Sequence, residues 1–246
     1  MIRKYQVIAN FNRGSETYTK AAHLQSKVAK NLSYQLANIT AEKILEIGCG
    51  TGLFTQHLIK AFPKADFLLT DISPLMIEQC RQQVSASANL KWGCMDGEQL
   101  DKFSSFDLIT SSMTFHWFKE FEQSLMNIKQ KLKKGGRLLF AILTENSLVE
   151  WRDMCRHFNY PIATVHFPSV PKLREQFPEL NLRVEIMKET YSSAHAFLKI
   201  LKLLGANAAH EKYIPLTPDK MRKLIRYFNH AIEVSYEVVY GEYTSR

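Results

Sequence analysis

The stretch Ile44-Leu45-Glu46-Ile47-Gly48-Cys49-Gly50-Thr51-Gly52 decides the fold. Its first residues form a short apolar run that is typical of a buried strand, and glycine then occupies every second position. Because glycine has no side chain, the backbone turns sharply there and lets a ligand approach the carboxyl edge of a sheet closely. The stretch therefore predicts a nucleotide-type ligand at this loop.

The spacing of the glycines narrows the class of ligand. The dinucleotide fingerprint G-x-G-x-x-G would require glycine at position 53, where this chain has Leu53, and the spacing here is G-x-G-x-G. This difference argues against a hydride-transfer enzyme.

Apolar strands and amphipathic helices alternate on the carboxyl side of the loop. An alternation of this kind predicts an α/β fold with a mostly parallel sheet and helices on both faces. The expected strands are 43–47, 66–70, 90–94, 106–110, 137–143 and 231–240, and the expected helices are 23–38, 53–62, 120–132 and one that begins at Pro74.

A single domain is expected, because 246 residues with 46% hydrophobic content suffice for one core. We divide it into an N-terminal helical lid segment (1–40), a ligand-binding core (41–145), a substrate-side insertion (146–230) and a closing strand (231–246). The insertion contains prolines at 161, 168, 171 and 178, among others, and a helix on which Phe197, Leu201 and Leu204 share one face.

Composition bounds the environment of the protein. Residues 1–10 lack the apolar core of a secretory signal, and no apolar run near the motifs approaches the roughly 20 residues of a membrane span. The four cysteines show no C-x-x-C pair or metal spacing, so we expect a cytoplasmic protein without a metal. The net charge of +8 is compatible with an anionic partner, although Lys and Arg are scattered.

Glu46-x-Gly48-x-Gly50-x-Gly52 resembles motif I of class I methyltransferases. This resemblance implies a Rossmann-like, seven-stranded sheet and S-adenosylmethionine as the cofactor, with Glu46 near its cationic methionine end. The alternative is a strand-end glutamate beside an ordinary tight turn.

Two further carboxylates are predicted to bind the cofactor. Asp71 ends the second strand 19 residues after Gly52, where it can accept hydrogen bonds from both ribose hydroxyls; alternatively it caps the helix before Pro74, although Ser73 is the better-placed cap. Asp96 resembles the family residue that accepts from the adenine amino group, and the alternative is a turn aspartate. The resemblance adds three neighbours to the predicted cofactor site, Ile72, Met95 and Ser111.

The segment 132–137, Leu-Lys-Lys-Gly-Gly-Arg, resembles the methyltransferase signature L-K-P-G-G, with Lys134 in place of proline. Its glycines are expected to turn a helix into the fifth strand, without a role in chemistry.

The segment 111–117, Ser-Ser-Met-Thr-Phe-His-Trp, indicates which subfamily of methyltransferases the chain resembles. It lacks the Asp/Asn-Pro-Pro-aromatic motif of enzymes that methylate nucleic acid bases. It resembles instead the S-N-x-x-x-Q-W motif of the malonyl-acyl-carrier-protein methyltransferase family, whose reaction begins biotin synthesis and whose relatives act on aconitate. Ser112 replaces Asn and His116 replaces Gln.

The resemblance to this family extends along nearly the whole chain. Residues 11–25 are similar to its F-x-R-A-A-x-x-Y-x-x-x-A-x-L-Q segment, 143–150 to its T-L-x-x-x-S-L-x-E segment, 198–206 to its L-R-x-L-K-x-I-G-A helix and 235–241 to its final strand. The family implies methyl transfer to the carboxylate of malonyl-acyl-carrier protein, an acidic partner, and neither nucleic acid nor a membrane is expected as a partner. Coenzyme A as the carrier, aconitate or a quinone ring as the acceptor, and a non-catalytic cofactor-binding regulator remain alternatives.

A carboxylate acceptor, with a reference pKa near about 4, is ionised at neutral pH and needs no general base. Positioning the acceptor is the expected source of catalysis. The candidates for catalytic residues are Tyr18, His116 and Lys202, with Arg13 and Arg152 as further cations for the carboxylate. Each also has a plain structural explanation: Tyr18 as packing for its segment, His116 as a loop histidine and Lys202 as part of a solvated helix face.

Overall fold

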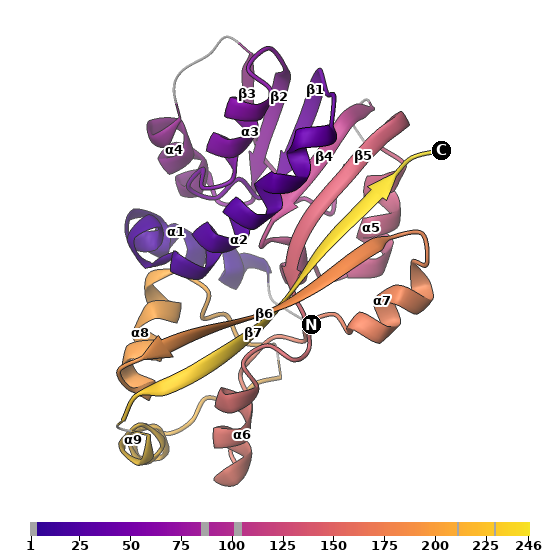
Figure 1. The fold of residues 1–246 in the computed structure, drawn as a ribbon. Coiled ribbons are helices and arrows are strands. Elements are labelled where there is room, and N and C mark those ends of the chain that lie inside the picture. The colour runs from indigo at the N-terminus through magenta and orange to yellow at the C-terminus, as the bar shows by residue number, and fades with distance from the viewer. Residues whose placement is uncertain (1–3, 85–88, 101–104, 211, 229) are drawn as a thin grey trace.

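The computed structural model describes residues 4–84, 89–100, 105–210, 212–228 and 230–246. Its centre is a seven-stranded sheet in the order β3-β2-β1-β4-β5-β7-β6 (Figure 1). The strands are β1 (Lys43–Ile47), β2 (Asp66–Asp71), β3 (Leu90–Cys94), β4 (Phe106–Ser112), β5 (Leu132–Leu143), β6 (Asn181–Tyr191) and β7 (Ile232–Thr244).

Strands β1 to β5 pair in parallel, and β7 runs antiparallel to both β5 and β6. The predicted α/β class, with a mostly parallel seven-stranded sheet, is confirmed. Parallel pairing brings the carboxyl ends of β1, β2 and β4 to one edge, which is where ligands bind in open α/β sheets.

Helices cover both faces of the sheet. The core divides into one cluster that includes Leu32, Leu58 and Ile77, and a second that includes Leu125 and Leu173. The helices are α1 (Lys4–Ala21), α2 (His23–Ser33), α3 (Thr55–Ala61), α4 (Pro74–Gln83), α5 (Phe121–Lys129), α6 (Val149–His157), α7 (Val170–Gln176), α8 (Ala194–Leu203) and α9 (Pro218–Tyr227), with short 3-10 turns at Tyr34–Asn38 and Phe115–Trp117.

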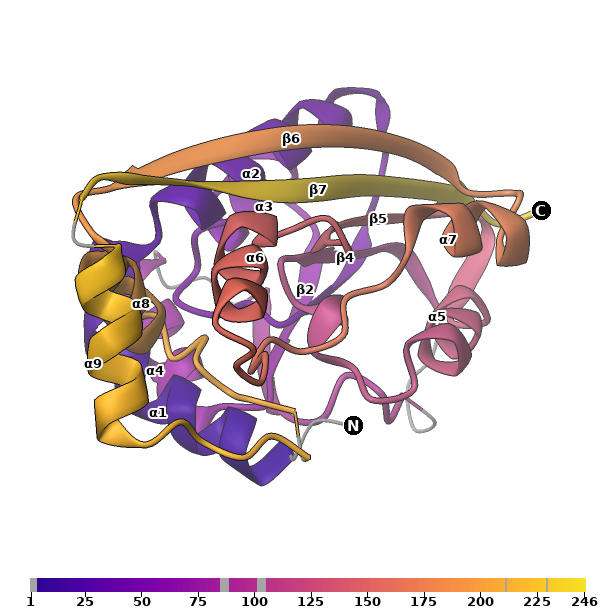
Figure 2. The same cartoon turned by 90° about the horizontal axis from the view of Figure 1, so that it is seen from below.

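The segment 146–230 contains β6, a strand that the sequence reading did not identify. β6 and β7 run side by side past the end of the other strands and carry α8 and α9 at their far end (Figures 1 and 2). Leu182, Val184 and Ile186 alternate with charged residues, which is the period-two signal of an edge strand. The tail 231–240 was correctly predicted as a strand, and it extends to Thr244.

The glycines after α5 lie inside β5, which corrects the expected helix-to-strand turn at 132–137. β5 begins at Leu132 opposite Phe106, and the register then shifts so that Arg137 pairs with Leu108. The residues between them form a bulge, which Gly135 permits with its φ of 76°.

Helix α1 packs against α4 on one side and α8 on the other. Its contact with α8 depends on Gly14 and Gly205, since a side-chain carbon on Gly14 would come within 2.8 Å of the Gly205 nitrogen. The two helices therefore meet backbone to backbone. No helix in the described ranges is long and apolar enough to span a bilayer.

Candidate active site

The glycine loop begins where β1 ends and lines a cavity at the carboxyl edge of the sheet, called here the glycine-loop cavity. The N–H groups of Gly48 and Cys49 donate to the Thr70 carbonyl at 2.8 and 2.9 Å, which ties the loop to β2. Gly48 has a φ of 75°, and a side chain there would collide with Thr114. Glycine is therefore required at this position on two counts.

Glu46 points into this cavity from the end of β1 and is 1% exposed. The Thr55 hydroxyl donates to its Oε2 at 2.7 Å, while its Oε1 is buried without any hydrogen-bond partner. Burial raises the pKa of Glu46 to about 8, against the bond from Thr55 and with a further contribution from the charge of Asp71. An unpaired buried carboxylate oxygen is the complement of a cationic donor such as an ammonium group.

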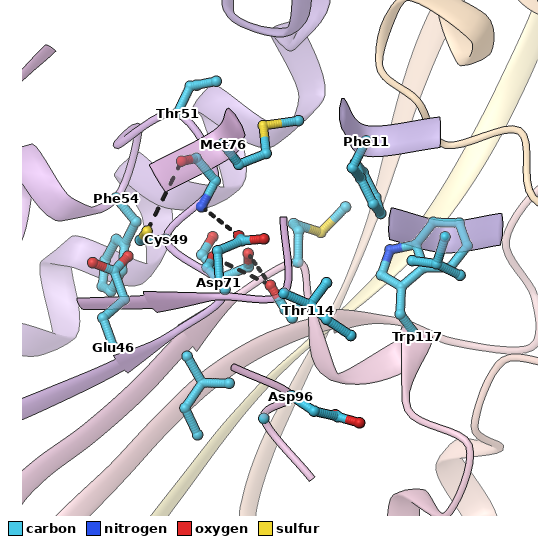
Figure 3. A pocket seen from close by; sticks show the side chains of 18 of the residues that line it. Phe11, Glu46, Cys49, Thr51, Phe54, Asp71, Met76, Asp96, Thr114 and Trp117 are labelled. Atoms are coloured by element: carbon cyan, nitrogen blue, oxygen red, sulfur yellow. Dashed lines mark hydrogen bonds between the residues drawn. The ribbon is translucent and has the colours of Figure 1, made fainter. Parts of the chain in front are cut away.

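Asp71 ends β2 and lies centrally in the cavity, with Glu46 to one side and with Phe11 and Trp117 on the far side (Figure 3). The Gly50 and Ser73 N–H groups donate to its Oδ2 and Oδ1, at 2.9 and 2.8 Å. Burial raises its pKa to about 6, against these backbone bonds. Each oxygen keeps a lone pair for a ligand hydroxyl.

Ser73 is the N-cap of α4, as predicted, because its hydroxyl accepts from the Met76 N–H at 3.1 Å. Asp71 is therefore not needed as the cap.

Asp96 lines the same cavity, and Met95 and Ile72 also contribute to its wall. Its Oδ1 accepts from the Glu98 N–H at 3.1 Å. Its Oδ2 forms an ion pair with Lys4, and Lys4 also pairs with Glu98. Lys4 belongs to no motif, so no sequence pattern indicates this contact.

Helix α1 lies across the glycine-loop cavity and is tied to it at two further places. Ser73 donates to the Asn12 amide oxygen at 2.6 Å, and Thr19 donates to the Thr51 hydroxyl at 2.9 Å. With the Lys4 ion pairs, these bonds hold α1 to the residues that line the cavity.

A second cavity of about 420 Å³, called here the apolar cavity, lies on the other side of Trp117. Its walls come from α2, α6, α8, α9, β6, β7 and the loop 161–167. Most of the side chains are apolar, among them Trp151, Phe167, Leu201 and Met221.

The two cavities meet at five residues that line both, called here the junction. They are Phe11, Tyr18, Gln25, Met113 and Trp117. The Phe11 and Trp117 rings pack edge to face with centroids 5.4 Å apart. Burial, with the nearby charge of Asp71, raises the pKa of Tyr18 far above its usual range, so its phenol stays protonated.

His116 lines the apolar cavity and is 4% exposed. Its Nδ1 accepts from the Leu143 N–H at 3.4 Å, which places the ring proton on Nε2. Burial lowers the pKa of His116 to about 3. The ring is therefore neutral at physiological pH and acts as a hydrogen-bonding group, without a positive charge.

Several predicted residues lie elsewhere. Gly52 supports the turn through its N–H, which donates to the Cys49 carbonyl at 2.9 Å, and does not line the cavity. Ser111 is fully buried and donates to the Ile47 carbonyl at 2.8 Å, while Ser112 lines the cavity in its place. The difference is one residue, because successive side chains of a strand point to opposite faces.

The candidate cations are also elsewhere. Lys202 is exposed on α8 and lines neither cavity, because the apolar face of that helix is the one turned inward. Arg13 is exposed and binds Asn10 on its own helix, and an Arg152 nitrogen donates to the Glu145 carbonyl at 2.5 Å. Gln25, Met113 and Lys4 were not singled out, although Gln25 falls inside the segment 11–25 that carries the resemblance.

Known proteins that resemble the chain are methyltransferases. Residues 45–138 match the family model described as "Methyltransferase domain". The chain is 33% identical to the malonyl-[acyl-carrier protein] O-methyltransferase of Magnetococcus marinus, over 98% of this chain and 93% of that protein. It is 31% identical to the biotin biosynthesis bifunctional protein BioCD of Bordetella avium, over 96% of this chain and 52% of that protein. A putative methyltransferase of Bacillus halodurans shares the fold with a TM-score of 0.62 at 15% identity, over 89% of this chain and 98% of that one.

Proposed function

Because the chain belongs to the malonyl-[acyl-carrier protein] O-methyltransferase family, we propose that it transfers a methyl group from S-adenosylmethionine to the free carboxylate of malonyl-acyl-carrier protein. The product is a malonyl methyl ester, and the biotin-synthesis name of the Bordetella avium relative supports a role in the first steps of that route. The observation that carries the proposal is the meeting of the glycine-loop cavity and the apolar cavity at the junction.

The residues of the glycine-loop cavity fit S-adenosylmethionine. The unpaired Oε1 of Glu46 suits the ammonium group of the methionine end, and the Asp71 carboxylate suits the ribose hydroxyls. Asp96, Met95 and Ile72 would enclose the adenine. Among the other predicted residues, Gly48 and Gly50 line this cavity and leave room for the ligand.

S-adenosylmethionine supplies a methyl group on a positively charged sulfur. A carboxylate oxygen forms the new bond to the methyl carbon as the carbon–sulfur bond breaks, and that electron pair returns to sulfur. The products are a neutral ester and a neutral thioether, and no proton is transferred. A neutral His116 is consistent with this chemistry, because no group has to accept a proton.

The described residues therefore contribute positioning and the exclusion of water. Tyr18 and Trp117 at the junction would hold the acceptor carboxylate, and the apolar cavity would take the thioester arm behind it. His116 would donate a hydrogen bond from Nε2 to the arm. The predicted lid segment 1–40 stays a proposal, and the bonds from α1 to residues that line the glycine-loop cavity support it.

Methyl transfer tests the proposal directly. Purified protein is incubated with methyl-labelled S-adenosylmethionine and malonyl-acyl-carrier protein, and the expected product is a base-labile methyl ester on the carrier. Parallel reactions contain malonyl-coenzyme A, aconitate or a quinone precursor. Transfer to aconitate or the quinone but not to either malonyl thioester would overturn the acceptor assignment. Cofactor binding without transfer to any acceptor would favour a regulatory protein.

A further inference from the structure

The junction contains hydrogen-bonding groups that the protein itself leaves unused. The Oε1 of Gln25 is buried and has no partner. Within the described ranges, the Gln25 amide nitrogen, the Tyr18 hydroxyl and the Trp117 indole N–H also make no hydrogen bond to another residue. Buried polar groups are normally paired, and the Gln25 oxygen is not. Tyr18 and Trp117 are half-buried and line the same two cavities, so their unused donors and this oxygen together indicate a ligand that pairs with them.

Gln25 lies in the first turn of α2 and lines both cavities. The oxygen and nitrogen of a glutamine amide exchange places by a half-turn, and hydrogen bonds decide which faces a given side. With no protein partner to hold either orientation, the amide is free to present its NH₂ group to an acceptor oxygen at the junction. The phenol and the indole add one donor each.

Positive charge is missing from the same place. Among the described lining residues, no arginine or lysine lies at the junction or in the apolar cavity. Lys4 is the one lysine in the glycine-loop wall, and it is paired with Asp96 and Glu98. Besides Asp96 and Glu98, the carboxylates that line the cavities are Glu46 and Asp71 on one side and Glu189, paired with Lys27 at 2.6 Å, on the other.

We propose that Gln25, with Tyr18 and Trp117, positions the acceptor carboxylate through neutral hydrogen bonds, and that the sulfonium of the cofactor is the only positive charge that attracts it. The inference rests on the proposed function and specifies how the acceptor is recognised. The acceptor then binds well only after the cofactor, because the empty wall is neutral or negative. Once the methyl group has moved, both the ester and the thioether are neutral, so the attraction is lost and the products are released.

The charge dependence is tested by binding, without turnover. The affinity of malonyl-pantetheine, which lacks the charges of coenzyme A and of the carrier, is measured by calorimetry on protein saturated with one of two analogues. S-adenosylhomocysteine has a neutral sulfur, whereas sinefungin carries an ammonium group near the position of the sulfonium methyl. We expect binding about tenfold tighter or more with sinefungin. Equal affinities would overturn the inference.

The role of Gln25 is tested with two substitutions. Gln25→Ala removes the donor, and Gln25→Glu adds a charge that repels the carboxylate, so kcat/KM for the malonyl thioester is expected to fall by about tenfold and by more, respectively. The affinity for S-adenosylhomocysteine, which also reports on folding, should stay the same for Gln25→Ala. Gln56→Ala, an exposed position on α3, is the matched control.

The outcomes separate this inference from the proposed function. If the wild-type protein does not methylate the thioester, the proposed function is wrong. A wild-type protein that methylates it, while Gln25→Ala does so equally well, shows that Gln25 does not position the acceptor.

Discussion

At the scale of single residues, the burial of Glu46 lowers the stability of the protein, whereas the same carboxyl group is proposed to bind a cation. Its carboxyl group is buried at 1% exposure with one oxygen unpaired, and its pKa is raised to about 8 from an ordinary value of 4.5. The folded protein therefore holds a proton on Glu46 that the unfolded chain releases. Between those two pKa values the stability falls as the pH rises, because the unfolded state binds fewer protons. The residue thus reduces stability in order to bind a cation.

The substitution Glu46→Gln tests this balance. Near pH 8 the variant is expected to melt several degrees above the wild type, and the difference should shrink as the pH falls toward about 4, because Glu46 then becomes neutral in the unfolded chain as well. Its affinity for S-adenosylmethionine should fall by about tenfold or more, because the ammonium group loses its charged partner. Thermal melts across this pH range and calorimetry provide the two measurements. A variant that binds the cofactor as well as the wild type would remove Glu46 from the cofactor site.

The raised pKa of Glu46 also predicts that protons are released when the cofactor binds. To pair with an ammonium group, Glu46 must give up its proton, so cofactor binding near pH 7 should release protons to the buffer. Calorimetry in buffers with different ionisation enthalpies measures this release. The Glu46→Gln variant should release fewer protons than the wild type, and equal release would assign the proton to another group.

At the scale of elements, helix α1 lines the glycine-loop cavity and is the proposed lid over it. It is held by the ion pairs of Lys4 and by the bonds Ser73–Asn12 and Thr19–Thr51. The Lys4 side chain is 33% exposed, so solvent screens its ion pairs and limits their contribution to roughly 1 kcal/mol. Such a contact is weak enough to open during each catalytic cycle.

Removing this contact should speed cofactor exchange. Lys4→Ala is expected to raise the dissociation rate of S-adenosylhomocysteine by a few fold, in line with a loss of about 1 kcal/mol or less. High salt should have the same effect on the wild type and little on the variant. Stopped-flow fluorescence measures the rate, and Lys20→Ala, exposed at the other end of α1, is the control. Similar rates for the two variants would show that Lys4 does not hold the helix.

The sequence predicted the elements whose signals are local. Asp71 ends β2 and Glu46 is the last residue but one of β1, so their places follow from a short pattern. Lys4 reaches Asp96 across 92 positions of the chain, and no periodicity indicates a contact of that kind. Lys202 lies on the solvent side of α8, as the amphipathic pattern of that helix indicates, so its predicted catalytic role rests on the resemblance alone.

At the scale of the whole molecule, part of the positive charge that makes up the net charge of +8 lies near the apolar cavity. Met221 of α9 lines that cavity, and Lys220, Lys223 and Arg226 are exposed on the same helix. In the described part of the chain, these three cations have no carboxylate partner within salt-bridge distance. An acidic carrier protein would therefore be steered toward the cavity that takes its arm.

This steering should appear in the salt dependence of the reaction. The value of kcat/KM for malonyl-acyl-carrier protein is expected to fall by about tenfold from low to high salt, whereas the value for malonyl-pantetheine should change little. Lys223→Glu should lower the first value and leave the second unchanged. Steady-state assays with both thioesters measure these effects, and parallel salt curves would exclude a docking role for α9.

The backbone contact between Gly14 and Gly205 joins the two halves of the site mechanically. Helix α1 lines the glycine-loop cavity, whereas α8 forms a wall of the apolar cavity. No side chains lie between the two backbones that could adjust to a movement. An outward displacement of α1 therefore either moves α8 with it or breaks the contact. The exits of the spent cofactor and of the esterified arm would therefore open together. A larger residue at position 14 would push α1 and α8 apart and hold both cavities partly open.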